Sequence, residues 1–147
     1  MNNSIRGFEV AATYLLVIIG FLLIIFGIFY FKSKRIKDEP IEDILSRLTQ
    51  EEQTLYKMAL KPENVPNTFI YALSTCHHCK KTREFLDENS VPYTIIYIDK
   101  YPKQLYKNLL DRLKIYNPRG SYPTIRLANG QIITGFREHA LREALIK

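Results

Sequence analysis

The sequence predicts an α/β domain with a four-stranded mixed sheet, preceded by a single transmembrane helix and a short helical connector. Two observations lead to this prediction: residues 10–31 contain no charged side chain, and strand and helix patterns alternate from residue 68 onward. The expected segments are an N-terminal membrane anchor over residues 1–35, a juxtamembrane connector over 36–66 and the α/β domain over 67–147. A chain of 147 residues has room for one ordinary domain and one small extra element.

The anchor prediction depends on the apolar run from Val10 to Phe31, where we expect a helix over about 10–31. Its 22 residues are enough to cross the hydrocarbon core of a bilayer, which takes about 20 helical residues. Tyr14 and Tyr30 lie near its ends, as interfacial aromatic residues do. A cleaved signal peptide is the alternative, but its apolar region would be about 7–15 residues long. We therefore expect a retained helix with the lipid bilayer as its partner.

The charges that flank the run predict its orientation. The cations after it are Lys32, Lys34, Arg35 and Lys37, whereas Arg6 is the cation before it. The positive-inside rule then predicts a single-pass protein of the cell membrane whose soluble domain is cytoplasmic. An extracytoplasmic domain is the alternative.

The formal net charge of +6 resides in the C-terminal domain. Residues 67–147 carry 13 basic and 7 acidic side chains, whereas residues 1–66 carry 8 of each. Such an excess can attract an anionic thiol or an acidic protein, although a solvated basic surface is the plainer interpretation. Because no nucleic-acid recognition motif accompanies it, we expect no nucleic-acid partner.

Two short helices are predicted in the connector. The first has apolar residues at the spacing of one helix face: Ile41, Ile44, Leu45 and Leu48. Thr49 and Glu52 can form a capping box at the start of the second helix, and Pro62 ends it. These helices are either a docking element for a partner or a membrane surface, or a spacer that packs on the next domain. We favour the spacer.

The domain that follows is expected to have the order β-α-β-α-β-β-α. The expected strands cover residues 68–73, 93–98, 124–128 and 131–134, and the expected helices cover 80–89, start near Pro102, and close the chain after Gly135. Asn129-Gly130 is a signal for a two-residue hairpin between the last two strands.

The two cysteines of the chain, Cys76 and Cys79, lie at the first junction of strand and helix. A Cys-x-x-Cys in this position is typical of thioredoxin-like redox proteins. Free N–H groups and the positive end of the helix dipole favour a thiolate there. The thiolate is the nucleophile of disulfide exchange. We therefore expect a redox-active disulfide between Cys76 and Cys79, a low thiol pKa for Cys76, and no bound cofactor.

Three motifs together resemble the glutaredoxin family over residues 67–147. They are Ser74-Thr75-Cys76-His77-His78-Cys79, Ser121-Tyr122-Pro123-Thr124, and Asn129-Gly130 followed by Thr134-Gly135-Phe136-Arg137. The Gly-Phe-Arg ending is similar to redoxins that donate electrons to ribonucleotide reductase.

The resemblance implies a protein disulfide oxidoreductase in which Cys76 attacks and Cys79 resolves. It also implies a cis peptide bond before Pro123 and a substrate-binding surface made by Thr75, Tyr122, Pro123, Gly135 and Phe136. Disulfide-containing proteins would be the substrates. A reductase or a low-molecular-weight thiol would be the electron donor.

Three sites depart from the family pattern outside the cysteine motif. Glutaredoxins commonly have a lysine, which helps to hold glutathione, where this chain has Leu73, and Thr-Val before the cis-proline, where it has Ser121-Tyr122. They commonly have Gly-Gly with acidic residues before the last helix, where this chain has Thr134-Gly135-Phe136-Arg137-Glu138. Glutathione is thus expected to be a poor ligand.

The dipeptide His77-His78 replaces the usual Pro-Tyr. A protonated imidazole there would stabilise the thiolate and make the disulfide more oxidising. Solvated loop side chains are the alternative. His139 is interpreted as a surface residue.

Two other classes of function are alternatives. Cysteine and histidine are suitable ligands for zinc or an iron–sulfur cluster, but four adjacent ligands cannot all face one ion, so no metal site is expected. A non-catalytic adaptor is the other alternative, and the intact cysteine pair argues against it.

Overall fold

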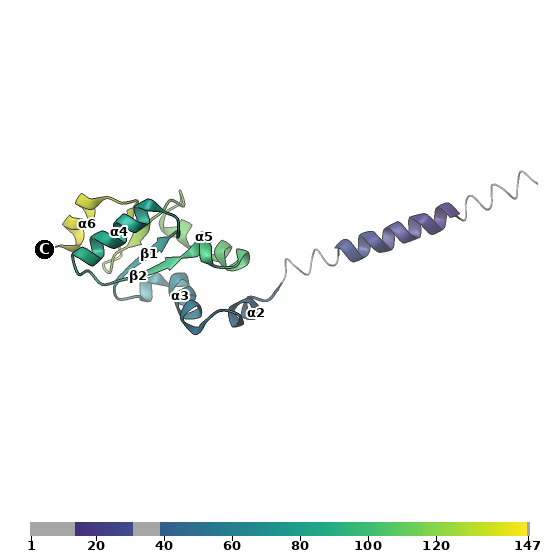
Figure 1. Cartoon of the computed structure of the whole chain (residues 1–147), viewed down its shortest axis with the longest axis horizontal. Helices are drawn as coiled ribbons and strands as arrows, with labels where there is room; N and C mark the ends of the chain where they lie inside the picture. Colours follow the sequence, from purple (N-terminus) through teal and green to yellow (C-terminus); the bar gives the residue numbers. More distant parts are fainter. Residues whose placement is uncertain (1–13, 31–38, 147) are drawn as a thin grey trace, which may run out of the picture. The chain divides into compact units, whose positions relative to one another are not determined.

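The computed structural model describes residues 14–30 and 39–146 (Figure 1). The chain divides between Pro40 and Ile41 into two units. In the first unit, a helix covers residues 14–30. The second unit contains every other helix and all strands of the described residues.

The second unit has the predicted β-α-β-α-β-β-α order, with two helices in front of it. In chain order the elements are α2 (Ile41–Ser46), α3 (Gln50–Leu60), η1 (Pro62–Asn64), β1 (Thr68–Ala72), α4 (His77–Glu88), β2 (Tyr93–Tyr97), η2 (Ile98–Lys100), α5 (Lys103–Tyr116), β3 (Thr124–Arg126), β4 (Ile132–Thr134) and α6 (Glu138–Leu145). The predicted four-stranded mixed sheet is confirmed: the strand order is β2-β1-β3-β4, with β1 parallel to β2 and the other pairs antiparallel.

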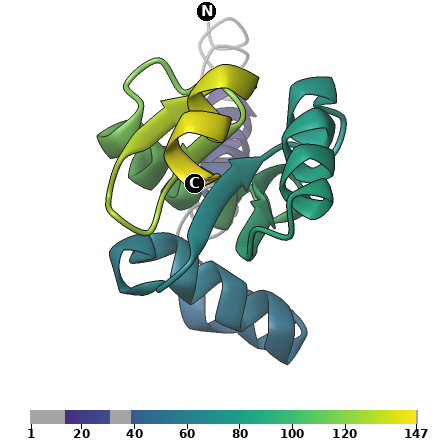
Figure 2. The same cartoon turned by 90° about the vertical axis from the view of Figure 1, so that its left-hand side faces the viewer.

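Helices cover both faces of the sheet, and β1 separates two hydrophobic clusters. Successive residues of a strand point to opposite faces, so Phe69 and Tyr71 belong to one cluster and Ile70 and Ala72 to the other. Figures 1 and 2 show α3 on one side of β1 and α6 on the other. All five residues of β1 are buried, as expected for a central strand between two helical layers.

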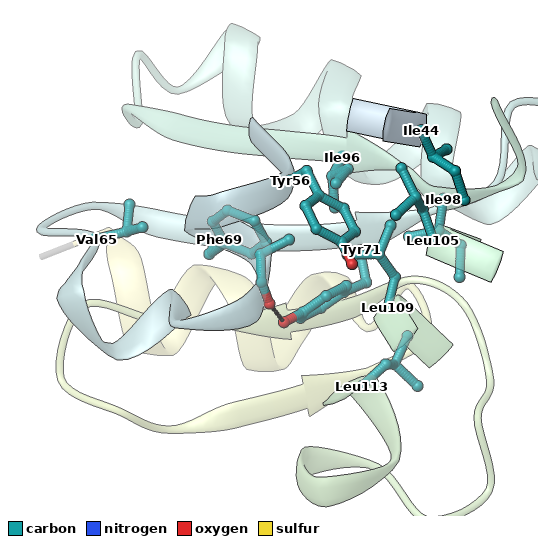
Figure 3. Close-up of a cluster of buried hydrophobic side chains, with 11 residues drawn as sticks. Ile44, Tyr56, Val65, Phe69, Tyr71, Ile96, Ile98, Leu105, Leu109 and Leu113 are labelled. Atoms are coloured by element: carbon teal, nitrogen blue, oxygen red, sulfur yellow. Dashed lines mark hydrogen bonds between the residues drawn. The ribbon is translucent and has the colours of Figure 1, made fainter. Parts of the chain in front are cut away.

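The first cluster joins the predicted connector to the α/β domain (Figure 3). Its members are Ile44, Tyr56, Ala59, Val65, Phe69, Tyr71, Ile96, Ile98, Leu105, Leu109 and Leu113. The buried Tyr71 hydroxyl donates a hydrogen bond to the Ala59 carbonyl oxygen at the end of α3. The helices α2 and α3 therefore pack on the sheet, and the compact unit begins at Ile41 rather than at residue 67. The predicted capping box is confirmed, since Thr49 and Glu52 exchange both of its hydrogen bonds.

The second cluster covers the other face of the sheet, beneath α4 and α6. Its members are Ile70, Ala72, Cys79, Phe85, Leu86, Ile125, Leu127, Ile133 and Leu141. One residue of the Cys-x-x-Cys motif is thus part of the hydrophobic core.

The turn between β3 and β4 differs from the predicted two-residue hairpin. The Leu127 N–H donates to Gln131 O at 2.9 Å, so three residues form the loop. Gly130 adopts φ +88° whereas Asn129 does not have a positive φ. A two-residue type I′ turn needs positive φ at both central residues; a three-residue loop needs it only at its last residue, which is glycine here.

The predicted membrane localisation is wrong. Among residues 14–30 and 39–146, no helix combines the length and the apolar character that a bilayer span requires. The described helix over residues 14–30 is about 26 Å long, whereas the hydrocarbon core of a bilayer is about 30 Å thick. The remainder of the predicted span, residues 10–13 and 31, lies outside the described part of the chain, as do the flanking cations from Lys32 to Lys37. A transmembrane helix and a bilayer partner are therefore not supported.

Candidate active site

Cys76 and Cys79 lie at the start of α4 and form a disulfide, with their Cα atoms 5.2 Å apart. Cys76 is the N-cap residue, and its Sγ accepts a hydrogen bond from the Cys79 backbone N–H at 3.2 Å. The helix begins at His77, three residues earlier than predicted. The earlier start was not recognised because cysteine is not one of the usual polar N-cap residues.

The two cysteines differ in their exposure to solvent. Cys79 is only 2% exposed and belongs to the second cluster, whereas Cys76 is partly exposed. A hydrogen bond to the charged form of a group lowers its pKa, and the N-terminus of a helix favours a negative charge. In the dithiol state the same N–H group can therefore stabilise a Cys76 thiolate that solvent and substrates can reach.

A second loop, between α5 and β3, contains Tyr122 and Pro123. The peptide bond between them is cis, as the resemblance implied, and Pro123 is buried. The Pro123 carbonyl accepts a hydrogen bond from the Gly135 N–H at 2.7 Å. Gly135 has φ +73°, a conformation that residues with a Cβ rarely adopt. This contact brings two of the predicted substrate-binding residues together.

Asn117, which the sequence analysis missed, fixes the loop before Pro123. Its side chain is 5% exposed, and its Nδ2 donates to Ser121 O at 3.0 Å, to Ser121 Oγ at 3.0 Å and to Thr124 Oγ1 at 2.8 Å. The available signal was the Asn-Pro dipeptide directly after a predicted helix, which favours a turn.

Ser74 and Asp99, also missed, connect the loop before Cys76 to η2. The Ser74 N–H donates to Asp99 Oδ1 at 2.9 Å, and the Ser74 hydroxyl donates to Asp99 Oδ2. Burial alone would raise the pKa of Asp99, but the hydrogen bonds from Ser74 outweigh burial and leave this pKa below its usual value. Since β1 and β2 are parallel neighbours, residues that follow them meet at one edge of the sheet. That topological signal was available in the sequence.

The remaining predicted site residues lie in different environments. Thr75, His77 and His78 are exposed, and the two imidazole rings are 6.1 Å apart. Phe136 packs edge-on against Phe85 with ring centroids 6.4 Å apart. Their roles in substrate binding and thiolate tuning stay predictions.

Leu73, which stands where glutaredoxins commonly have the lysine, is half-buried against the first cluster. Burial, and then the neighbouring Tyr106, raises the pKa of Tyr122. Within the described residues, no three or more His, Cys, Asp or Glu side chains are grouped so that they could hold a metal ion.

Comparison with known proteins agrees with this geometry. The sequence profile of the glutaredoxin family matches residues 52–133. The chain belongs to the glutaredoxin family. The match begins inside α3, so part of the predicted connector lies within the family region.

Three solved structures show the same fold in archaeal relatives. Methanoredoxin from Methanosarcina acetivorans is 34% identical, with 54% of this chain and 84% of that chain covered and a TM-score of 0.51. The glutaredoxin from Methanosarcina mazei Go1 is 31% identical (55% and 79% covered, TM-score 0.50), and glutaredoxin grx-1 from Archaeoglobus fulgidus is 28% identical (69% and 97% covered, TM-score 0.52). A search of curated proteins found no match.

Membership of this family together with the Cys76–Cys79 pair assigns a general activity. The protein is a glutaredoxin-like thiol-disulfide oxidoreductase, and its family uses thiol reductants and disulfide substrates.

Proposed function

We propose that this glutaredoxin reduces disulfide bonds in proteins by two-step dithiol exchange through Cys76 and Cys79. The observation that supports this most directly is the hydrogen bond from the Cys79 N–H to Cys76 Sγ at the N-terminus of α4. It favours a thiolate on the more exposed cysteine, Cys76, and leaves the buried Cys79 to act second.

The two steps transfer two electrons to the substrate. The Cys76 thiolate attacks one sulfur of the substrate disulfide, which breaks the substrate S–S bond, forms a mixed disulfide and releases the first substrate thiolate. The Cys79 thiolate then attacks Cys76 Sγ, which forms the Cys76–Cys79 disulfide and releases the second substrate thiolate. Both substrate thiolates take protons from solvent, and an external dithiol or two thiols reduce the enzyme again.

The proposed substrate surface surrounds Cys76. Thr75 is exposed beside it, and the backbone of Tyr122, next to the cis-proline, would pair with an extended substrate segment. Gly135 hydrogen-bonds to Pro123, and Phe136 follows it in sequence. The exposed His77 and His78 would tune the thiolate when protonated.

We further propose a protein reductase as the electron donor in preference to glutathione. The half-buried Leu73 offers no charge to a glutathione carboxylate. The ending Thr134-Gly135-Phe136-Arg137 is similar to that of redoxins linked to ribonucleotide reductase. Both features support a thioredoxin-like source of electrons.

Trapping of substrates tests the proposed mechanism. Cys79→Ser removes the resolving thiol, so mixed disulfides between Cys76 and substrates should accumulate on incubation with insulin or a cell extract. Cys76→Ser is the matched control and should trap none, since it lacks the attacking thiol. Non-reducing electrophoresis and mass spectrometry measure the adducts. Equal trapping by the two variants would show that the roles are assigned incorrectly.

A further inference from the structure

We propose that Asp99 is a positioning residue for Cys76: its carboxylate fixes the turn from Leu73 to Cys76 and thereby holds Cys76 Sγ against the Cys79 N–H. This inference rests on the proposed function, because it concerns the thiol that begins the exchange. Within the described residues, no hydrogen bond joins Asp99 to the sulfur of Cys76 or Cys79.

The carboxylate of Asp99 holds one residue at two points. It accepts the backbone N–H of Ser74 with Oδ1 and the hydroxyl of the same residue with Oδ2. A two-point contact fixes the orientation of the backbone as well as its position. Because Ser74 is exposed, its position is fixed by these hydrogen bonds and not by packing in the core.

The element that contains Asp99 is anchored in the hydrophobic core. Asp99 is the middle residue of η2, directly after Ile98, which is completely buried in the first cluster. Strand β2 precedes η2 and pairs with β1 up to the Ala72–Tyr97 position. A site element supported by a rigid strand is placed more accurately than one on a free loop.

The held turn leads directly to the reactive sulfur. The Cys76 N–H donates to Leu73 O at 3.2 Å, so residues 73–76 form one tight turn that contains Ser74. The turn ends in the extended backbone of Cys76, with φ −79° and ψ 113°, from which Sγ accepts the Cys79 N–H. If Ser74 moves, the cap conformation of Cys76 is no longer determined.

A direct electrostatic role of Asp99 predicts the opposite result. A carboxylate near a thiolate disfavours the thiolate, so its removal would lower the pKa of Cys76. A positioning role predicts a rise, because the stabilising N–H contact is lost. Two charged or titratable groups interact with Asp99: Lys100 and Tyr122. Both are the same in every variant, so the sign of the change in the pKa of Cys76 separates the two roles.

The test measures alkylation of Cys76 by iodoacetamide as a function of pH, in the full chain with Cys79→Ser so that one thiol remains. We expect Asp99→Ala and Ser74→Ala each to raise the midpoint by about one pH unit, which slows alkylation by about tenfold at a pH well below the unmodified midpoint. Ser74→Thr keeps both donors and should restore the wild-type midpoint.

Asp87→Asn is the matched control. Asp87 is also an exposed carboxylate that accepts a hydrogen bond, from Tyr93 OH at 2.9 Å, but it lies at the far end of α4. We expect an unchanged midpoint in this variant. If Asp99→Ala does not fold by circular dichroism, Asp99→Asn replaces it, with a smaller rise expected because one acceptor remains.

A midpoint that stays constant or falls in the Asp99 variants would overturn the inference, as would a Ser74→Thr midpoint equal to that of Ser74→Ala. Reduction of insulin by the unmodified chain tests the proposed function separately. A chain that reduces insulin but shows no midpoint shift in the variants would retain the function and lose the inference.

Discussion

Asn117 holds the cis-proline loop through a single amide group that serves three acceptors. Asn117→Ala removes these donors and leaves the buried Thr124 hydroxyl with fewer partners. We expect the free energy of unfolding to fall by about 1–3 kcal/mol, because several hydrogen bonds of about 0.5–1.5 kcal/mol each are lost. Urea denaturation measures it.

Asn89→Ala is the control for that substitution. The Asn89 side chain makes one hydrogen bond, to Phe85 O at 2.7 Å, at the end of α4. A smaller loss of stability is expected for it, without a change in disulfide reduction. Equal losses for the two variants would contradict the role assigned to Asn117.

Leu73 is the residue on which the donor preference depends most. We expect the unmodified chain to react slowly with a glutathione mixed disulfide, and Leu73→Lys to accelerate the reaction about two- to fivefold by attracting the glutathione carboxylates, with one ion pair contributing up to about 1 kcal/mol. Ile115→Lys adds the same charge at a highly exposed position of α5. Acceleration by this control, or a fast reaction of the unmodified chain, would refute the preference.

At the scale of elements, η1 and α5 are joined by one exposed carboxylate. Glu63 accepts hydrogen bonds from Arg112 at 2.8 Å and from Tyr116 OH at 2.8 Å. A backbone hydrogen bond, the Tyr116 hydroxyl and Arg112 lower the pKa of Glu63 from 4.5 to about 2. A lowered pKa means that the contribution to stability is complete above about pH 4.5 and disappears as the pH falls toward 2.

Glu63→Gln should therefore melt below the unmodified chain at pH 7, and the difference should shrink below pH 4.5 and vanish near pH 2. Tyr116→Phe removes one donor and should show part of the same dependence. Thermal denaturation at a series of pH values measures both. A difference that persists at pH 2 would show that the ionised carboxylate is not its cause.

Local patterns were sufficient for most elements. The capping box of α3 was predictable because both of its partners lie within four residues of sequence. The loop between β3 and β4 was not, since its length depends on which residues of the two strands pair. In the site, the cysteines can be recognised by their spacing. The role of Asp99 depends on Ser74, which lies 25 residues away in sequence, and that of Asn117 depends on the loop conformation that brings Ser121 and Thr124 to its amide.

For the molecule as a whole, the two-sided sheet explains why the predicted connector belongs to the compact unit. The face of β1 that presents Phe69 and Tyr71 needs a cover, and α3 supplies Tyr56 and Ala59. Amphipathic spacing predicted helices there, as observed, and favoured packing on the next domain. The predicted anchor is the case in which the sequence prediction failed. Its apolar composition suggested a transmembrane helix, but no described helix is long and apolar enough to cross a bilayer.

The position of the cysteines also links the redox state to the unfolding equilibrium. In a thermodynamic cycle, the free energy by which the folded chain favours the dithiol over the disulfide more than the unfolded chain does equals the extra free energy of unfolding of the reduced protein. The proposed Cys76 thiolate would be stabilised by the helix N-terminus only in the folded chain, so the reduced protein should melt at the higher temperature. Calorimetry of the oxidised and reduced forms would then report how oxidising the fold makes this disulfide, without any substrate, and a higher melting temperature for the oxidised form would mean that the fold favours the closed bond.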